Sequence, residues 1–154
     1  MQFSLATATV ILAALVGTVV AESHTVHFTN NCGFGTPTLI QGPNVLSTGG
    51  DYTSNGPLIS AIAYLQTGSC GFNGEGCTLI ETTLENGASS TDISLIPPHT
   101  FSVTSGFGYF NGCDGAGADC TSADCSTAFH QPNDTFVQVA CTVDNVDLAI
   151  TFCD

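Results

Sequence analysis

Residues 137–153 read Val-Gln-Val-Ala-Cys-Thr-Val-Asp-Asn-Val-Asp-Leu-Ala-Ile-Thr-Phe-Cys, and this stretch does most to decide the fold. Apolar side chains alternate with polar ones in two segments, at Val137, Val139 and Cys141 and then at Val146, Leu148, Ile150 and Phe152. A period of two is typical of strands with one buried face. The residues between them, 143–145, have turn chemistry. We therefore predict two strands joined as a hairpin.

The same alternation recurs in the earlier part of the chain. It is found at Val26 and Phe28, at Ile93 and Leu95, and at Phe101 and Val103. Seventeen Gly and six Pro separate these segments, and no long window has the pattern of an amphipathic helix. Many short strands with frequent turns indicate an all-β antiparallel sandwich or barrel. The irregular stretch 111–126 is predicted to be a loop held by disulfides.

The charge of the chain excludes several classes of partner. It contains 13 Asp and Glu but no Lys or Arg, which gives a formal net charge of −13. Nucleic acids and anionic membranes are excluded, because both are recognised through cations. A neutral polymer, a cation or a basic protein remains. Because 43% of the residues are hydrophobic, the acidity does not indicate disorder.

The first 21 residues have the pattern of a secretory signal peptide. An apolar run at 10–16 is followed by small residues that end at Ala21, so cleavage is predicted before Glu22. The run is short for a membrane span of about 20 apolar residues. We expect residues 1–21 to be removed and residues 22–154 to form one secreted domain, outside the cell or at its wall and free of the membrane.

All eight cysteines lie in the expected mature domain, at Cys32, Cys70, Cys77, Cys113, Cys120, Cys125, Cys141 and Cys153. An even number behind a signal peptide predicts four disulfides, while zinc is disfavoured by the spacing. Counting alone leaves 105 pairings open. The triplet that begins at Asn133 is a glycosylation sequon, which fits a surface loop.

Several blocks in order give the chain a resemblance to the thaumatin-like proteins, in their small form. Residues 28–32 read Phe-Thr-Asn-Asn-Cys, an extended strand that ends in Asn-x-Cys. Residues 78–84 read Thr-Leu-Ile-Glu-Thr-Thr-Leu, and residues 92–96 read Asp-Ile-Ser-Leu-Ile. Residues 139–153 are similar to the end of the family's sequences. The resemblance covers nearly the whole expected mature chain. It implies a flattened, disulfide-bonded two-sheet sandwich.

The resemblance also implies how the cysteines pair. The implied pairs are Cys32–Cys153, Cys70–Cys77, Cys113–Cys141 and Cys120–Cys125. The large members of the family have a disulfide-rich second lobe. Here only 16 positions separate Cys125 from Cys141, so most of that lobe is predicted to be absent.

A candidate site follows from the same resemblance. Large members have an acidic cleft linked to β-1,3-glucan binding and, in some, to weak endoglucanase activity. Its glutamate corresponds to Glu81, and two of its aspartates correspond to Asp92 and Asp134. Gln66 stands at the position of its arginine and Pro97 at that of the third aspartate. The resemblance therefore assigns Glu81, Asp92, Asp134 and Gln66 to substrate binding.

Chemistry limits what these residues could do. Glycoside hydrolysis needs two carboxyl groups that flank the bond, one of them protonated. Glu81 as general acid and Asp92 as base or nucleophile could form such a pair. Because the arginine and part of the cleft are missing, we expect non-catalytic contact with neutral β-glucan. The alternatives are weak endo-β-1,3-glucanase activity, inhibition of a foreign glycosidase, as some small family members show, and solvated surface acids without a ligand.

No cofactor or metal is expected, and the protein is predicted to be a monomer. Asp114, Asp119 and Asp124 could bind calcium, but they lack the EF-hand pattern, which favours a solvated loop. The four His residues show no metal-ligand spacing.

Overall fold

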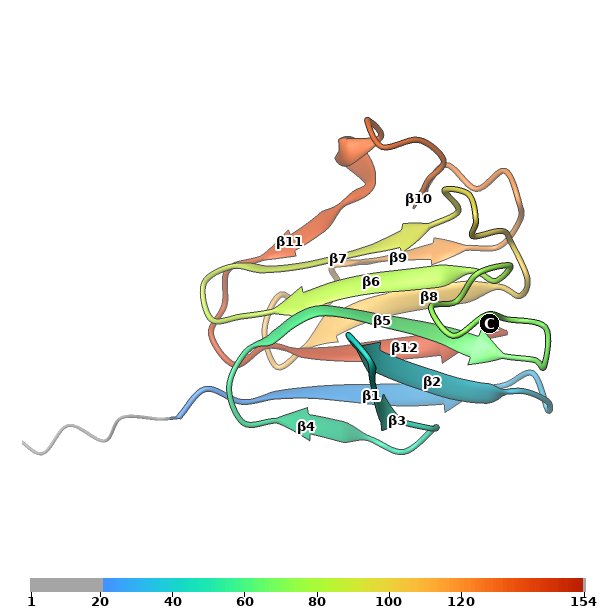
Figure 1. Cartoon of the computed structure of the whole chain (residues 1–154). Helices are drawn as coiled ribbons and strands as arrows, with labels where there is room; N and C mark the ends of the chain where they lie inside the picture. Colours follow the sequence, from blue (N-terminus) through green and yellow to red (C-terminus); the bar gives the residue numbers. More distant parts are fainter. Residues whose placement is uncertain (1–20, 154) are drawn as a thin grey trace, which may run out of the picture.

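The computed structural model describes residues 21–153, which form two packed β-sheets (Figure 1). One sheet has five strands in the order β4 (Tyr52–Ser54), β1 (His24–Asn30), β12 (Asp147–Phe152), β8 (Ser105–Phe110) and β9 (Gly117–Cys120). The other has the order β10 (Ala128–Phe129), β7 (Ser89–Ser94), β6 (Leu79–Leu84), β5 (Leu58–Gln66), β2 (Thr36–Gln41) and β3 (Asn44–Ser47), with β11 (Val139–Cys141) also paired to β7. The predicted all-β sandwich is confirmed.

Most strand pairs are antiparallel, but each sheet contains one parallel pair. β1 pairs with β12 in parallel, and β10 pairs with β7 in parallel. The first and last strands of the domain therefore lie side by side in the middle of the five-stranded sheet (Figure 1).

The core lies between the sheets and is built from the alternating residues of the sequence. Val26 and Phe28 of β1 point inward, as do Leu148, Ile150 and Phe152 of β12. The rings of Phe28 and Phe152 stack with centroids 6.4 Å apart. The seven-stranded sheet contributes residues that include Leu39, Ala63, Leu65, Ile80 and Ile93. Burial of these side chains is the main stabilising contribution to the fold.

The prediction of a hairpin at 143–145 is wrong. The turn exists, and Asn145 adopts a left-handed conformation with φ of 56°. However, it joins β11 of the seven-stranded sheet to β12 of the five-stranded sheet, and these strands pair with β7, β1 and β8 instead of with each other. Alternation shows which side chains are buried, but a sandwich buries the inner faces of both sheets alike.

Three further details differ from the expected strands. Val137 lies in a short 3-10 helix, η1 (Thr135–Val137), instead of a strand. The segment 101–103 has no regular strand, although Val103 is buried. The stretch 111–126 is not wholly irregular, because it contains β9, which pairs with β8.

The structure contains the four disulfides that the resemblance implies. Cys32–Cys153 joins the two ends of the domain across 121 positions of sequence, and Cys113–Cys141 spans 28 positions. Cys70–Cys77 and Cys120–Cys125 close local loops of 7 and 5 positions.

The predicted signal peptide, residues 1–21, lies outside the described residues except for Ala21. Within residues 21–153, no helix has the length and apolar character needed to cross a membrane.

The disulfides provide a test of how the fold is stabilised. In the chain-entropy treatment, closing a loop of 121 positions contributes about 5 kcal/mol and closing one of 5 positions about 2 kcal/mol. We expect Cys32→Ser/Cys153→Ser to lose more unfolding free energy than Cys120→Ser/Cys125→Ser in urea titrations. Equal losses would show that strain or local packing, not loop length, sets the contribution.

Candidate functional site

The candidate site lies on the outer face of the seven-stranded sheet, across β5, β6 and β7. Ile62 of β5 is paired with Glu81 of β6, and Glu81 is paired with Asp92 of β7. Residues directly opposite each other on neighbouring strands project from the same face. The two carboxyl groups that the family resemblance selected are therefore cross-strand neighbours.

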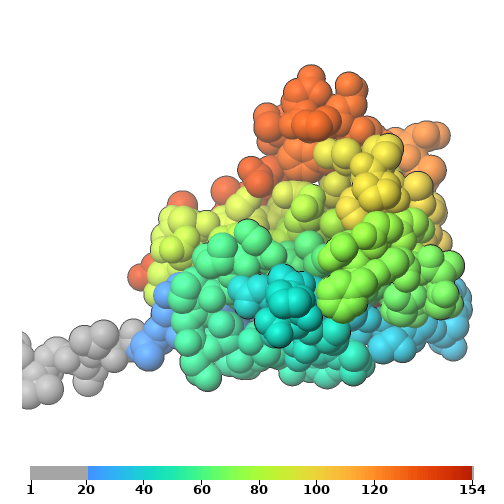
Figure 2. Space-filling view, viewed as in Figure 1, coloured from blue at the N-terminus to red at the C-terminus, as the bar shows by residue number. Residues whose placement is uncertain are grey.

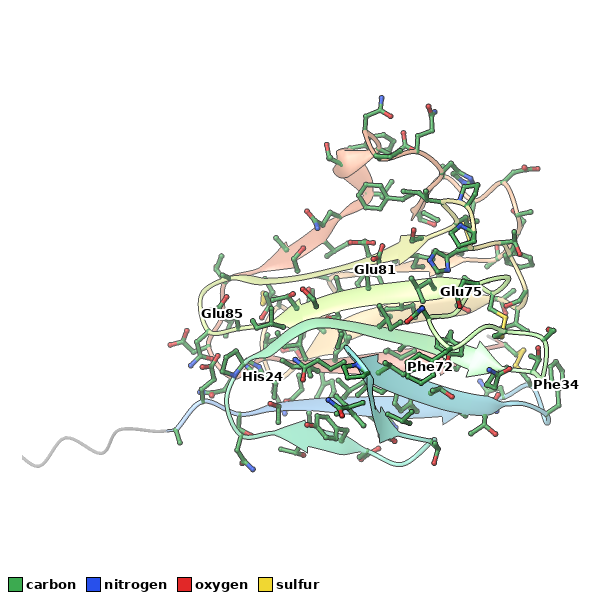
Figure 3. All side chains as sticks on the ribbon, viewed as in Figure 1. His24, Phe34, Phe72, Glu75, Glu81 and Glu85 are labelled. Carbon is green, nitrogen blue, oxygen red and sulfur yellow. A yellow bond between two sulfur atoms is a disulfide. The ribbon has the colours of Figure 1, made fainter. Side chains whose placement is uncertain are left out.

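A wall rises on the β7 side of these residues. The segment 129–138, which begins in β10 and includes η1, projects beyond the sheet (Figures 1 and 2). It lies between Cys125 and Cys141, the interval whose shortness led us to predict that a second lobe is mostly absent. Glu81 lies on β6 below this projection (Figure 3).

An open depression with a volume of about 340 Å³ lies between the sheet and the wall. Its polar lining comprises Ser60, Glu81, Thr82, Thr83, Ser90, Asp92 and Gln138. Its apolar lining comprises Ala61, Ile62, Ile96, Phe129 and Pro132. Sequence reasoning missed all of these except Glu81 and Asp92. The sequence feature that could have pointed to Phe129, Pro132 and Gln138 is their position between Cys125 and Cys141.

A β-bulge shapes one rim of the depression. The register of β5 against β6 shifts between Leu58 and Ala61, and Ser60 adopts φ of 51° within this interval. A left-handed serine is strained, and such bulges often redirect groups beside a functional site. The N–H of Ser60 donates a hydrogen bond of 3.0 Å to Oγ1 of Thr83.

Asp92 has the most perturbed environment at the site. Its side chain is only 7% exposed, although it faces the depression. Nε2 of Gln138 donates a long hydrogen bond of 3.5 Å to Oδ2, and Oδ1 has no partner. Burial and, secondarily, the negative charge of Glu81 raise the pKa of Asp92 to about 6, while the Gln138 amide opposes them.

The other two predicted site residues do not line the depression. Oδ2 of Asp134 accepts hydrogen bonds from the backbone N–H groups of His130 and Gln131, both at 3.0 Å, so its carboxylate stabilises the turn of the projecting segment.

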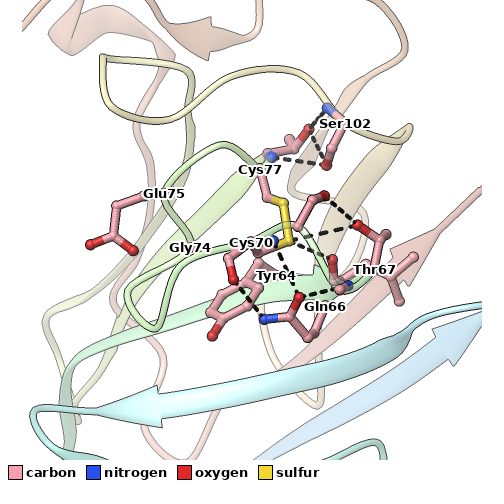
Figure 4. The surroundings of a disulfide bond; sticks show 12 residues. Tyr64, Gln66, Thr67, Cys70, Gly74, Glu75, Cys77 and Ser102 are labelled. Atoms are coloured by element: carbon pink, nitrogen blue, oxygen red, sulfur yellow. Dashed lines mark hydrogen bonds between the residues drawn. A yellow bond between two sulfur atoms is a disulfide. The ribbon is translucent and has the colours of Figure 1, made fainter.

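Gln66 stabilises the Cys70–Cys77 loop. Its Oε1 accepts from the N–H groups of Gly68 and Cys70, at 2.8 and 3.2 Å, and its Nε2 donates to the Cys70 carbonyl at 3.0 Å (Figure 4).

The three aspartates considered for calcium do not form a site. Within residues 21–153, no group of three or more His, Cys, Asp and Glu side chains is arranged to hold a metal ion.

Comparison with known proteins agrees with this architecture. The chain is 33% identical over 85 residues to thaumatin-like pathogenesis-related protein 2 of Avena sativa. The aligned part is 55% of this chain and 46% of the relative, so the chain spans about half the length of the curated relative that it matches. No family model matches the chain.

Two solved structures have the same fold. The thaumatin-like xylanase inhibitor TLXI aligns over 85% of this chain and 99% of its own, with a TM-score of 0.56 and 20% identity. The protein elicitor MoHrip2 from Magnaporthe oryzae aligns over 87% and 100%, with a TM-score of 0.50 and 14% identity.

The fold is therefore thaumatin-like. The chain is similar to thaumatin-like proteins in sequence as well as in fold, which confirms the resemblance seen in its ordered blocks. Its 154 residues fit the short form.

The raised pKa of Asp92 predicts a pH-dependent stability. In the unfolded chain this carboxyl releases its proton near pH 3.8, whereas the folded protein holds it until about pH 6. The native state binds the extra proton between these values, so stability falls as pH rises through this window. We expect the unfolding free energy of Asp92→Asn, relative to that of wild type, to increase by about 2 kcal/mol from pH 4 to pH 7.5. Denaturant titrations at both pH values measure this difference.

A matched control is Asp119→Asn, which removes one exposed carboxylate from β9 in the other sheet. Its pH profile should keep the shape of the wild-type profile. Identical profiles for wild type and Asp92→Asn would mean that Asp92 ionises as readily in the folded protein as in the unfolded chain.

Proposed function

We propose that this is a secreted thaumatin-like protein that binds a neutral polysaccharide, of the β-1,3-glucan class, in the depression over β5, β6 and β7, without catalysis. The observation that carries the proposal is the Glu81–Asp92 pair on the floor of the depression, where the Oδ1 of Asp92 and the nearby Oγ of Ser90 have no hydrogen-bond partner. Buried polar atoms without partners are rare and costly unless a ligand or water completes them.

The lining suits an uncharged sugar. Carboxyl, amide and hydroxyl groups can bond to the hydroxyls of a sugar, while Ile62, Phe129 and Pro132 offer apolar surface to its C–H face. The open shape admits an extended chain rather than enclosing a small molecule. The net charge of −13 disfavours anionic polymers.

The geometry gives less support to hydrolysis. Glu81 and Asp92 project side by side from one sheet face, so both would lie beneath a bound chain instead of on either side of a glycosidic bond. The open depression also gives water free access. If the protein were a glucanase, burial would make Asp92 the protonated partner, so the acid and base roles assigned from the sequence would be exchanged.

Export and modification are part of the proposal. The four disulfides favour an oxidising compartment, and the mature domain would comprise residues 22–154. Asn133 is exposed in a turn, which makes its sequon accessible to glycosylation. We propose that the protein acts as a monomer outside the cell or at a cell wall.

Retention on insoluble β-1,3-glucan at pH 5 tests the binding proposal. Glu81→Ala and Asp92→Ala should each weaken retention about tenfold, because each removes hydrogen bonds worth about 1.4 kcal/mol. Asp119→Ala, on the outer face of the other sheet, should bind like wild type. Unchanged binding by both site variants would place the ligand elsewhere. The glucanase alternative would be supported if wild type, but neither site variant, released soluble sugar from laminarin.

A protein partner is the second candidate. Phe136 is 80% exposed at the projecting segment, and a large exposed aromatic side chain is typical of an interface anchor. One protein of the same fold is a xylanase inhibitor. If this alternative holds, the protein should inhibit a xylanase or another secreted glycosidase, and Phe136→Ser should lower that inhibition at least tenfold while leaving glucan retention unchanged. No inhibition across a panel of such enzymes would remove this alternative.

A further inference from the structure

The inference concerns the two buried side-chain atoms without a partner, Oγ of Ser90 and Oδ1 of Asp92. Both residues belong to β7 and are two positions apart, so they project from the same face of the strand. Both line the depression. The floor therefore contains two hydrogen-bonding atoms that no group in the described residues satisfies. Because both atoms are closed to solvent, a ligand would engage them through a rotation of the side chain.

The groups around Asp92 determine whether its carboxyl group is more stable in the protonated or the ionised form. Glu81 faces it from β6, and the amide of Gln138 faces it from the projecting segment. Behind the sheet, the Tyr109 hydroxyl of β8 lies 3.0 Å from the Thr91 hydroxyl and 3.0 Å from the Val139 carbonyl. None of these groups is a cation.

Among residues 21–153, no histidine makes an ion pair or hydrogen bond with Asp92. The chain contains no Lys or Arg. His99 and His130, near this part of the fold, contact the backbone carbonyls of Gly74 and Cys125 through one ring nitrogen each. An ionised Asp92 would therefore be a buried charge opposed by Glu81, whereas a protonated Asp92 is a hydrogen-bond donor that lacks an acceptor.

We propose that Asp92 binds the ligand as a neutral carboxylic acid, which donates a hydrogen bond to a hydroxyl or ether oxygen of an uncharged glycan. The site would then select uncharged over carboxylated polysaccharides and release its ligand when Asp92 ionises. This inference rests on the proposed function and specifies the ligand class and pH range of that site.

Electrostatics supports the same ligand class. With its pKa raised to about 6, Asp92 is mostly protonated at pH 4.5 and mostly ionised at pH 7.5. A carboxylated sugar would bring another negative charge to Glu81 and Asp92, in a depression without a balancing cation. An uncharged sugar avoids this repulsion and supplies the missing acceptor.

The test is binding of the full mature domain to insoluble β-1,3-glucan from pH 4.5 to 8. Wild-type affinity should fall about tenfold or more across pH 6. Asp92→Asn should bind with nearly constant affinity, because its amide N–H donates at every pH. Asp119→Asn should keep the wild-type profile.

A second variant distinguishes ionisation of Asp92 from damage to the fold as the cause of lost binding. Glu81→Gln removes the negative charge that helps Asp92 hold its proton, so the pH at which binding is lost should move down, whatever the absolute affinity. A damaged fold would not produce such a shift. Circular dichroism at each pH checks that the variants are folded.

The ligand class is tested by competition at pH 4.5. Soluble, uncharged β-1,3-glucan should displace the protein from the insoluble polymer at least tenfold better than its carboxymethylated form. Constant wild-type affinity across the pH range, or equal competition by both polymers, would overturn the inference and leave the proposed function standing. No binding by wild type at any pH would overturn both.

Discussion

The shortage of cations governs how every carboxylate in this protein is accommodated. Without Lys or Arg, an ionised side chain is stabilised by solvent or by backbone N–H groups, amides or histidine. The N–H of Asn86 donates to Glu22 at 2.7 Å, and the N–H of Thr25 donates to Asp147 at 2.5 Å. Glu75 accepts from the backbone N–H and the side-chain amide of Asn73. These hydrogen bonds lower the pKa values of Glu22 and Glu75.

Asp92 differs from these residues because it accepts only one long hydrogen bond, from Gln138, although it is buried as Asp147 is. Several other carboxylates stabilise local structure, such as the turn at Asp134 or the contact of β1 with Asp147. Asp92 stabilises no such element in its ionised form. Glu22, Glu75, Asp134 and Asp147 are thus held by backbone N–H groups, whereas Asp92 is left available to a ligand.

The inward residues of the strands could be predicted from alternation, since a buried sheet face selects apolar side chains at every second position. The proximity of Glu81 and Asp92 could be predicted from the ordered blocks around them. Asp134 and Gln66 could not be placed in this way, because their local hydrogen bonds to neighbouring N–H groups determine where they point. The environment of Asp92 includes a contact with Gln138, 46 positions away, and no short motif records that contact.

The parallel pairing of β1 with β12 also determines when the domain can be completed. Strands β2, β3, β5, β6 and β7 follow one another closely in sequence and can assemble as soon as they are synthesised. β1 emerges before all of them, yet it pairs with a strand far along the chain, because Val26 of β1 is the partner of Leu148 of β12. The five-stranded sheet therefore cannot close until β12 has been synthesised, and the apolar side chains of β1 must await that strand. Contacts between residues so far apart in sequence form slowly. The partly folded sandwich is therefore a state to which chaperones could bind during biogenesis.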